Sequence, residues 1–334
     1  MAKERKILIF FLIILITTVA VNFFANRSGL SGEEIKRQAR VEEKSKKFSL
    51  APEVKTIQKS LTKNKVVLVY FFTGSCSNCE ATAPHVNAWY DTYRDKGLQT
   101  IGILSPEFAF EKEAPSTDAV VERLGIKYPV INDNNYDAWK AYKNNFWPRI
   151  YIIDRDGFMI YDHIGEGAYS QTEGEIKEAL NEGAMVADTK PLIDTDSSIP
   201  PIPQTGDTYL GYARNNQLGI GETHIRGIQK LSLPKIINPN KFYLGGTWNL
   251  SREFAENKYA GAKIILKYNA KEVYLVAGSL EANTLMLSQD DQKTVIEIYK
   301  TGLYKILTNK EAGEHTLEIT ITNPSLQTYV FRFR

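Results

Sequence analysis

The pattern of apolar and polar positions divides the chain into segments of different structure. An apolar run from Ile7 to Phe24 follows a short basic segment at the N-terminus. As a helix rising about 1.5 Å per residue it would span roughly 27 Å, close to the ~30 Å hydrocarbon core of a bilayer. Basic residues before such a run keep the N-terminus in the cytoplasm. The pattern predicts a single transmembrane signal anchor over 1–27 that places the rest of the chain outside. A cleaved signal peptide is the alternative, but no A-x-A cleavage site is present.

Residues 28–51 are rich in charge and predict a polar stalk. From 52 to 186 strands and helices alternate, which is typical of an α/β domain with layers of helices on a sheet. The expected strands are Val66–Phe72, Leu98–Leu104, Arg149–Asp154 and Phe158–Ile164, with a short apolar segment at Tyr128–Ile131. The expected helices run from Cys79 to about Lys96 around Pro84, and over Thr117–Leu124, Asn135–Lys143 and Gln171–Asn181. The turn Arg155–Gly157 makes the last two strands a hairpin, so the sheet should be mixed.

Residues 187–208 contain four prolines and no aromatic residue, which predicts an extended linker. Beyond it, 209–334 holds short strand-like runs separated by turn residues and no convincing helix. Such a pattern favours a β-sandwich or jelly roll. The expected strands are Phe242–Leu244, Ala262–Tyr268, Glu272–Val276, Thr284–Leu287, Val295–Tyr299, Tyr304–Leu307, His315–Ile321 and Tyr329–Phe333.

The charge balance of the chain limits the kinds of partner that it could bind. The chain has 41 basic and 39 acidic residues, well mixed, for a net charge of +2. This balance predicts no nucleic-acid surface. The four histidines, His85, His163, His224 and His315, share no metal-like spacing, so no catalytic metal site is implied. His85 is interpreted as a helix-surface residue.

Cys76 and Cys79 are the only cysteines, and they directly follow the apolar run Val66–Phe72. With no third cysteine in the chain, they cannot belong to a four-cysteine zinc site or to a framework of several disulfides. A loop of this length constrains the unfolded chain little, so the pair is a poor structural staple. At a strand-to-helix junction the helix dipole would favour a Cys76 thiolate. Cys76 is therefore the predicted nucleophile and Cys79 the resolving thiol, with no cofactor beyond this disulfide.

This stretch resembles the thioredoxin superfamily, in particular its membrane-tethered TlpA-like branch. The resemblance rests on the strand Val67–Phe72, the cysteine pair, Pro84 and Trp147-Pro148. It implies a thioredoxin fold and a cis-proline at Pro148 that faces the dithiol. Trp147, Ser77 and Asn78 would then dock the client, with the backbone edge of Trp147 free to pair with a peptide.

Further segments resemble the DipZ-like subgroup, in which a β-rich module similar to carbohydrate-binding domains follows the TlpA-like domain. They are Ser105–Lys112, Asp133–Tyr136, Gly165–Gly167, Tyr209–Ala213, Val273–Val276 and Gly313–Glu318. Some relatives carry a multi-span electron-carrying membrane domain, whereas a single span is expected here. The electron donor or acceptor should then be a separate membrane protein.

The identity of a proton acceptor for Cys79 stays open. The buried acid of many thioredoxins falls at Tyr70 here, and Glu107 and Glu111 are interpreted as solvated loop acids.

Thr73 and Arg149 offer a peroxiredoxin-like alternative, in which they would polarise a peroxide against Cys76. Five aromatic residues of the second domain could stack on a carbohydrate, although core packing is favoured; they are Tyr209, Tyr212, Tyr243, Trp248 and Tyr259. A carbohydrate-binding or adhesion protein with a vestigial redox domain is thus a second alternative. The preferred hypothesis is a membrane-anchored, extracytoplasmic thiol–disulfide oxidoreductase that acts on protein clients. The uncharged Ser77-Asn78 pair favours a reductant over an oxidant.

Overall fold

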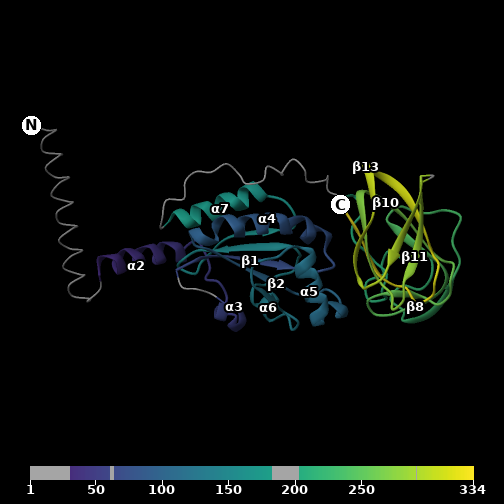
Figure 1. The fold of residues 1–334 in the computed structure, drawn as a ribbon, viewed down its shortest axis with the longest axis horizontal. Coiled ribbons are helices and arrows are strands. Elements are labelled where there is room, and N and C mark those ends of the chain that lie inside the picture. Colours follow the sequence, from purple (N-terminus) through teal and green to yellow (C-terminus); the bar gives the residue numbers. More distant parts are fainter. Residues whose placement is uncertain (1–30, 61–63, 183–202, 291) are drawn as a thin grey trace, which may run out of the picture.

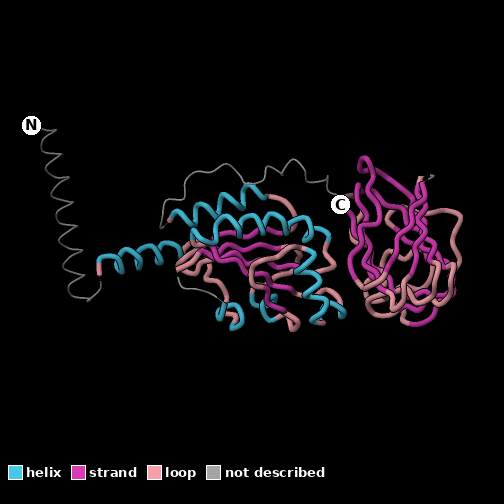
Figure 2. The backbone as a smooth tube through the Cα atoms, viewed as in Figure 1, coloured by secondary structure: helices cyan, strands magenta, loops and turns pink. Residues whose placement is uncertain are grey.

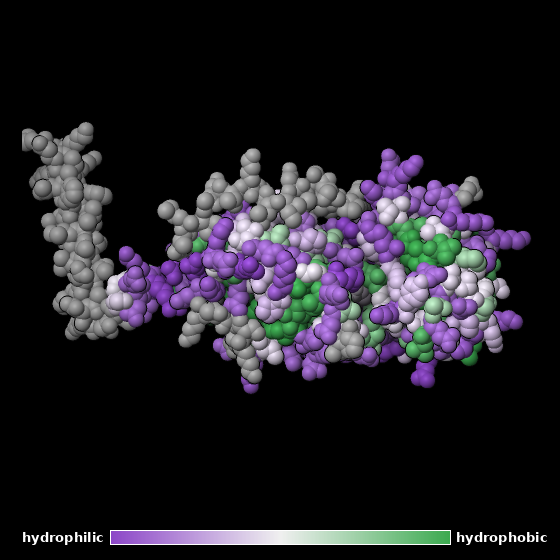
Figure 3. Space-filling view, viewed as in Figure 1, coloured by the Kyte–Doolittle hydropathy of each residue, from purple (hydrophilic) through white to green (hydrophobic). Residues whose placement is uncertain are grey.

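The described residues of this computed structural model, 31–334 without 61–63, 183–202 and 291, form two domains side by side (Figure 1). Among the described residues, helices lie in the first domain and in the segment that precedes it, whereas the second domain is built from strands (Figure 2). Hydrophilic residues cover much of both domains in one view, interrupted by apolar patches (Figure 3). The expected anchor, and the linker up to residue 202, lie outside the described residues. Within the part that is described, no helix has the length and apolar character needed to cross a membrane.

The predicted stalk contains helix α2, Gly32–Ser45. Ser31 caps it, because its hydroxyl accepts the backbone N–H of Glu34 while the Glu34 carboxylate accepts that of Ser31. The far end of α2 contacts the first domain. Arg40 donates two hydrogen bonds to Asp156, at 2.7 and 2.9 Å. The C-terminal part of α2 is therefore attached to the first domain.

This contact should weaken in acid. The hydrogen bond from Arg40 holds the pKa of Asp156 below its usual 3.8. A carboxyl group whose pKa is lowered by folding stabilises the fold above its unfolded pKa, and this contribution is lost as pH falls through the lowered value. We expect Arg40→Gln to reduce the free energy of unfolding by roughly 0.5–1 kcal/mol at pH 7 and by almost nothing near pH 2. Urea unfolding of both proteins at both pH values measures this; an equal difference at the two values would contradict it.

The first domain is built on a five-stranded mixed sheet in the order β3-β2-β1-β4-β5. The parallel pairs are β1 with β2 and β2 with β3, while β4 and β5 run antiparallel. Every residue of the central strand β1 is buried. The mixed sheet and its final hairpin confirm the prediction. The strands are β1 Val66–Phe72, β2 Leu98–Leu104, β3 Val130–Asn132, β4 Arg149–Ile153 and β5 Met159–Ile164.

Helices cover both faces of this sheet because β1 is apolar on both sides. Val66, Leu68, Tyr70 and Phe72 share one core with residues of α4 and α7, and the alternate residues share the other core with residues of α3 and α6. The helical elements are α3 Lys55–Ser60, α4 Ser77–Tyr93, η1 Arg94–Lys96, η2 Ala109–Lys112, α5 Ala114–Arg123, α6 Asp137–Ala141 and α7 Tyr169–Asn181. Pro84 lies inside α4, as expected.

The second domain is all-β in its described part, as predicted. Hydrogen bonds join its strands into one sheet in the order β12-β11-β13-β10-β14-β9-β8-β7, with β6 on β14 and a further pairing of β8 with β10. Contacts to this domain begin before the expected boundary, since Gln204 N–H already bonds to Asn269. The strands are β6 Thr208–Tyr209, β7 Gly227–Leu231, β8 Lys241–Leu250, β9 Ala255–Asn257, β10 Ala262–Gly278, β11 Asn283–Gln289, β12 Gln292–Ile298, β13 Gly302–Ile321 and β14 Gln327–Phe333.

Two pairs of predicted strands are single long strands. The expected Ala262–Tyr268 and Glu272–Val276 form one strand, β10, and the two strands expected between Tyr304 and Ile321 form β13. The pairing of β10 with β13 continues through an irregular register around Ala270, where the prediction had placed a turn. The prediction of separate strands was therefore wrong here.

The aromatic residues of the second domain serve different purposes. Trp248 and Tyr243 are almost completely buried, which confirms core packing for these two. Tyr212 packs partly buried against the same core. Tyr209 contacts the first domain through Glu107, 2.8 Å from its hydroxyl. Tyr259 remains 69% exposed, so among these five it is the ring that a planar ligand could most readily reach.

Candidate active site

The dithiol lies where β1 gives way to α4. Cys76 and Cys79 form a disulfide, with Cα atoms 5.2 Å apart. Cys76 is the N-cap of α4 in extended conformation, and its Sγ accepts the backbone N–H of Cys79 at 3.0 Å. The sulfur therefore occupies the place of a capping oxygen, at the positive end of the helix dipole. After reduction, this position would favour the thiolate form of Cys76.

The two cysteines differ in access. Cys76 is 6% exposed and Cys79 is fully buried. The roles of Cys76 as nucleophile and Cys79 as resolving thiol stay predictions. Of the intervening residues, Ser77 is buried and Asn78 is half-buried. Tyr70, at the position of the buried acid, donates its hydroxyl to the Cys79 carbonyl at 2.9 Å. Burial raises the pKa of Tyr70 well above 10, so this group is a hydrogen-bond donor and not a base near neutral pH.

Trp147 and Pro148 lie immediately before β4, which pairs with the central strand β1. Their peptide bond is cis, as the resemblance implied. Arg149, the next residue, pairs with Phe71 of β1, which places Pro148 next to the end of that strand. Trp147 packs against the core cluster that contains both cysteines. Among the described residues, none forms a backbone hydrogen bond with Trp147. Whether this edge receives a client stays a prediction.

Glu111 organises the loop between β1 and the dithiol. One carboxylate oxygen accepts the Thr73 hydroxyl at 2.6 Å and the Ser75 N–H at 2.8 Å. The other accepts the N–H groups of Glu107 and Phe108, at 2.7 and 3.0 Å. Burial raises the pKa of Glu111 despite these bonds. The interpretation of Glu111 as a solvated loop acid was wrong, because η2 and the preceding loop fold it inward.

Glu107 is also buried, and its partners come from the second domain. Its carboxylate accepts hydrogen bonds from Arg332, from Arg214 at 2.9 Å and from Tyr209. Burial alone would raise the pKa of Glu107, but the two guanidinium groups outweigh it and hold the pKa below its usual value. The interpretation as a solvated acid was wrong here as well, since the second domain covers this residue.

Arg332 reaches furthest toward the dithiol. Its Nε donates to the Ser75 carbonyl at 2.5 Å, and its other nitrogens pair with Glu107 and Asp207. We call Arg332, Glu107, Asp207 and Arg214 the Arg332 cluster. Sequence reasoning missed it, although a charged residue within the apolar strand that ends in Phe331-Arg332-Phe333 was a usable signal.

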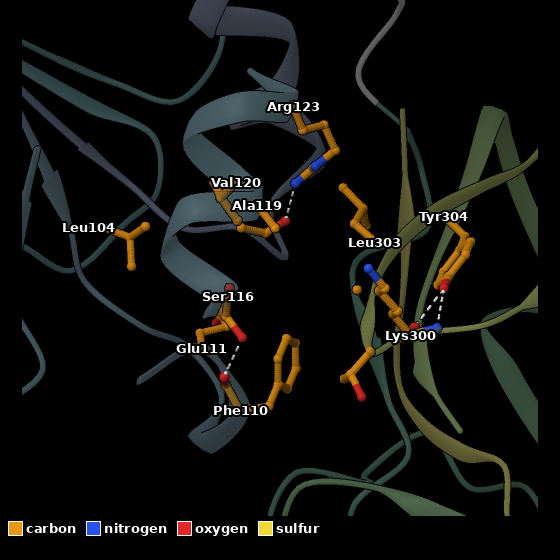
Figure 4. A pocket seen from close by; sticks show the side chains of 13 residues that line it. Leu104, Phe110, Glu111, Ser116, Ala119, Val120, Arg123, Lys300, Leu303 and Tyr304 are labelled. Atoms are coloured by element: carbon orange, nitrogen blue, oxygen red, sulfur yellow. Dashed lines mark hydrogen bonds between the residues drawn. The ribbon is translucent and has the colours of Figure 1, made fainter. Parts of the chain in front are cut away.

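Apolar contacts accompany these ion pairs at the domain interface. Phe108 packs with Tyr329, ring centroids 5.1 Å apart, in a cluster that also holds Val276 and Val330. A cavity of about 240 Å³ opens beside these apolar side chains, between α5 and residues 300–304 at the start of β13 (Figure 4). The two domains thus meet next to the loop that carries the cysteines.

Thr73 and Arg149, the residues on which the peroxidase alternative depends, interact with carboxylates. Thr73 donates to Glu111, and Arg149 pairs with Asp162 at 2.6 Å. This geometry favours disulfide exchange over peroxide chemistry. His85 is buried and stacked on Tyr169 at 3.5 Å, so its interpretation as a surface residue was wrong.

Comparison with known proteins supports both domains. Residues 41–162 match the model of the AhpC/TSA family, and residues 205–333 match that of the thioredoxin-like C-terminal domain. The chain is 34% identical to Protein DipZ of Mycobacterium bovis over 84% of this chain and 40% of that protein. It is 27% identical to Thiol-disulfide oxidoreductase ResA of Bacillus anthracis over 53% of this chain and 98% of that protein. It is also similar to the crystal structure of a putative thiol:disulfide interchange protein DsbE from Chlorobium tepidum, at 22% identity, covering 40% of this chain and 92% of that chain, with a TM-score of 0.34.

These matches confirm the resemblance to the thioredoxin superfamily and to DipZ that the motifs carried. The chain spans about 40% of the length of DipZ.

Proposed function

We propose that this chain is a thiol–disulfide oxidoreductase, since residues 41–162 match the model of the AhpC/TSA family and residues 205–333 match that of the thioredoxin-like C-terminal domain. The observation that carries the proposal is the disulfide at the N-terminus of α4, with Cys76 as cap and Cys79 buried behind it. The relatives DipZ and ResA support it, the latter through its name. The clients would be proteins with accessible disulfides.

The reaction follows from the position of the two sulfurs. In the reduced protein the Cys76 thiolate attacks one sulfur of a client disulfide, whose S–S bond breaks as a mixed disulfide forms. The Cys79 thiolate then attacks Cys76 Sγ and releases the client as a dithiol. Two electrons and two protons pass to the client, and the Cys76–Cys79 disulfide returns. A separate donor dithiol, which becomes a disulfide, restores the reduced form.

The client would dock along Trp147. Its unpaired backbone can accept an extended client segment as an added strand, next to the end of β1. Phe146, 51% exposed, offers an apolar contact beside it. Asn78, two residues after Cys76, is half-buried and offers a polar contact. The client cysteine would then meet Cys76, the more accessible of the two sulfurs.

Within this proposal the protein is a reductant held outside the cytoplasm. The Ser77-Asn78 pair adds no charge that would strongly stabilise the thiolate. The run Ile7–Phe24 would anchor the chain in the cell membrane, with the N-terminus in the cytoplasm, and the donor would be a membrane protein. A carbohydrate ligand for the second domain has Tyr259 as its best-placed aromatic residue.

Equilibration with redox buffers tests the function. The oxidised protein is incubated in buffers of graded potential, and free thiols are then alkylated and counted by mass spectrometry. We expect two thiols to appear together in a two-electron transition. A midpoint near about −270 mV is expected for a reductant, whereas about −120 mV would indicate an oxidant. A disulfide that stays closed at every potential, in a protein that remains folded, would overturn the proposed function.

A further inference from the structure

The second domain contributes a charged group to the dithiol loop. Arg332 lies near the end of β14, and its guanidinium is buried at the domain interface. Its Nε hydrogen bond ends on the carbonyl of Ser75, the residue immediately before Cys76. No other part of the second domain is seen to hydrogen-bond to this loop among the described residues. We propose that Arg332 is a positioning residue that favours the thiolate of Cys76, which rests on the redox function proposed above.

The peptide that precedes Cys76 is held from both sides. The Ser75 N–H donates to Glu111 of its own domain, and the Ser75 carbonyl accepts from Arg332. With Ser75 fixed, Cys76 keeps the extended conformation in which its sulfur accepts the Cys79 N–H. The guanidinium thus secures the capping geometry that stabilises negative charge on the sulfur, in a buried place where charges are weakly screened.

The charges around the loop determine the direction of the effect. The charged groups near the loop are the Arg332 cluster, Glu111 of the first domain, and the pair of Glu80 with Arg123 at the first turn of α4. The cluster itself holds two carboxylates and two guanidinium groups. Removing Arg332 leaves Glu107 and Asp207 with Arg214 alone, so the loop would face excess negative charge. Negative charge nearby raises a thiol pKa.

A purely structural role is distinguishable because the same strand offers a matched contact. Arg334 also crosses to the first domain and pairs with Glu166 at 2.6 Å, after β5 and not at the dithiol loop. Its substitution removes an interdomain ion pair of similar burial without touching Ser75. If Arg332 only held the domains together, the two substitutions would act alike on Cys76.

The experiment measures the pH dependence of Cys76 alkylation by iodoacetamide in the reduced, full-length protein. Because the chain has two cysteines, mass spectrometry identifies the modified residue directly. We expect Arg332→Gln to raise the pKa of Cys76 by about one unit, and thus to slow alkylation near pH 6 about tenfold. If the reduced dithiol is destabilised tenfold, the reduction potential of the Cys76–Cys79 couple falls by about 30 mV, which makes the protein a stronger reductant. Arg334→Gln should leave both readouts within about twofold of the unsubstituted protein.

A second variant tests the same inference if Arg332→Gln fails to fold. Asp207 competes for the charge of Arg332, and its side chain is 38% exposed, so Asp207→Asn should be tolerated. We expect it to change alkylation in the opposite direction, about two- to threefold faster near pH 6. Equal rates for the unsubstituted protein and Arg332→Gln, equal slowing by Arg334→Gln, or slower alkylation in Asp207→Asn would each overturn the inference. A native Cys76 that is never reduced would instead refute the proposed function.

Discussion

Cys76→Ser should abolish reduction of client disulfides, while Cys79→Ser should accumulate client proteins joined to Cys76. The first substitution removes the sulfur at the helix N-terminus, so no attacking thiolate remains. The second removes only the buried thiol that resolves the mixed disulfide. We expect the rate of insulin-disulfide reduction to fall at least 10³-fold in Cys76→Ser, a loss typical of removing a nucleophile. Non-reducing electrophoresis of Cys79→Ser, followed by mass spectrometry of the adducts, measures the second effect.

The double variant Cys76→Ser/Cys79→Ser provides the control, because it has no cysteine thiol. Adducts in this control would show trapping unrelated to the dithiol. If Cys76→Ser kept the biological activity of the protein, the adhesion alternative with a vestigial redox domain would be favoured instead.

Glu107→Ala should cost about 3 kcal/mol of unfolding free energy. Glu107 pairs with Arg332 and Arg214, and removing one partner of a buried ion pair typically costs ~3–5 kcal/mol, since the other charge stays buried. Asp207 still faces Arg332, which places the cost at the lower end. Urea unfolding, followed by circular dichroism and by tryptophan fluorescence, measures this.

The matched control for Glu107→Ala is Glu253→Ala. Glu253 also crosses the interface, where it accepts the N–H of Ala109 at an exposed position. Its removal should change the free energy of unfolding by less than about 0.5 kcal/mol. Equal losses for the two variants would show that Glu107 contributes only as a general interface contact.

Local patterns predicted the first domain well because its central strands, β1 and β2, are apolar on both faces. Val66–Phe72 and Leu98–Leu104 have the predicted boundaries. Helix α3 was missed because it is short and mostly polar, and only Ile57 and the preceding Val54 anchor it. In the second domain, Asn269 is typical of a turn, but β10 continues past it through an irregular register with β13, and no local signal distinguishes the two outcomes.

The residues of the candidate site also differ in how well the sequence predicts them. The cysteine pair and Trp147-Pro148 were predictable because each is a short sequence motif that can be recognised without knowing the fold. The burial of Glu107 was not, because Arg332, which covers it, lies 225 positions further along the chain. Isolated acidic residues in a loop are usually solvated, and only the docking of a second domain reverses that expectation here.

The separation of Ser75 and Arg332 by 257 positions has a consequence for biosynthesis. Proteins emerge from the ribosome from the N-terminal end, and domains generally fold in that order. The nascent thioredoxin-fold domain would therefore close its sheet and expose its sulfurs before the guanidinium exists. During that interval Cys76 and Cys79 would react without the hydrogen bond from Arg332 to Ser75. Their reactivity would change once β14 is synthesised and docks.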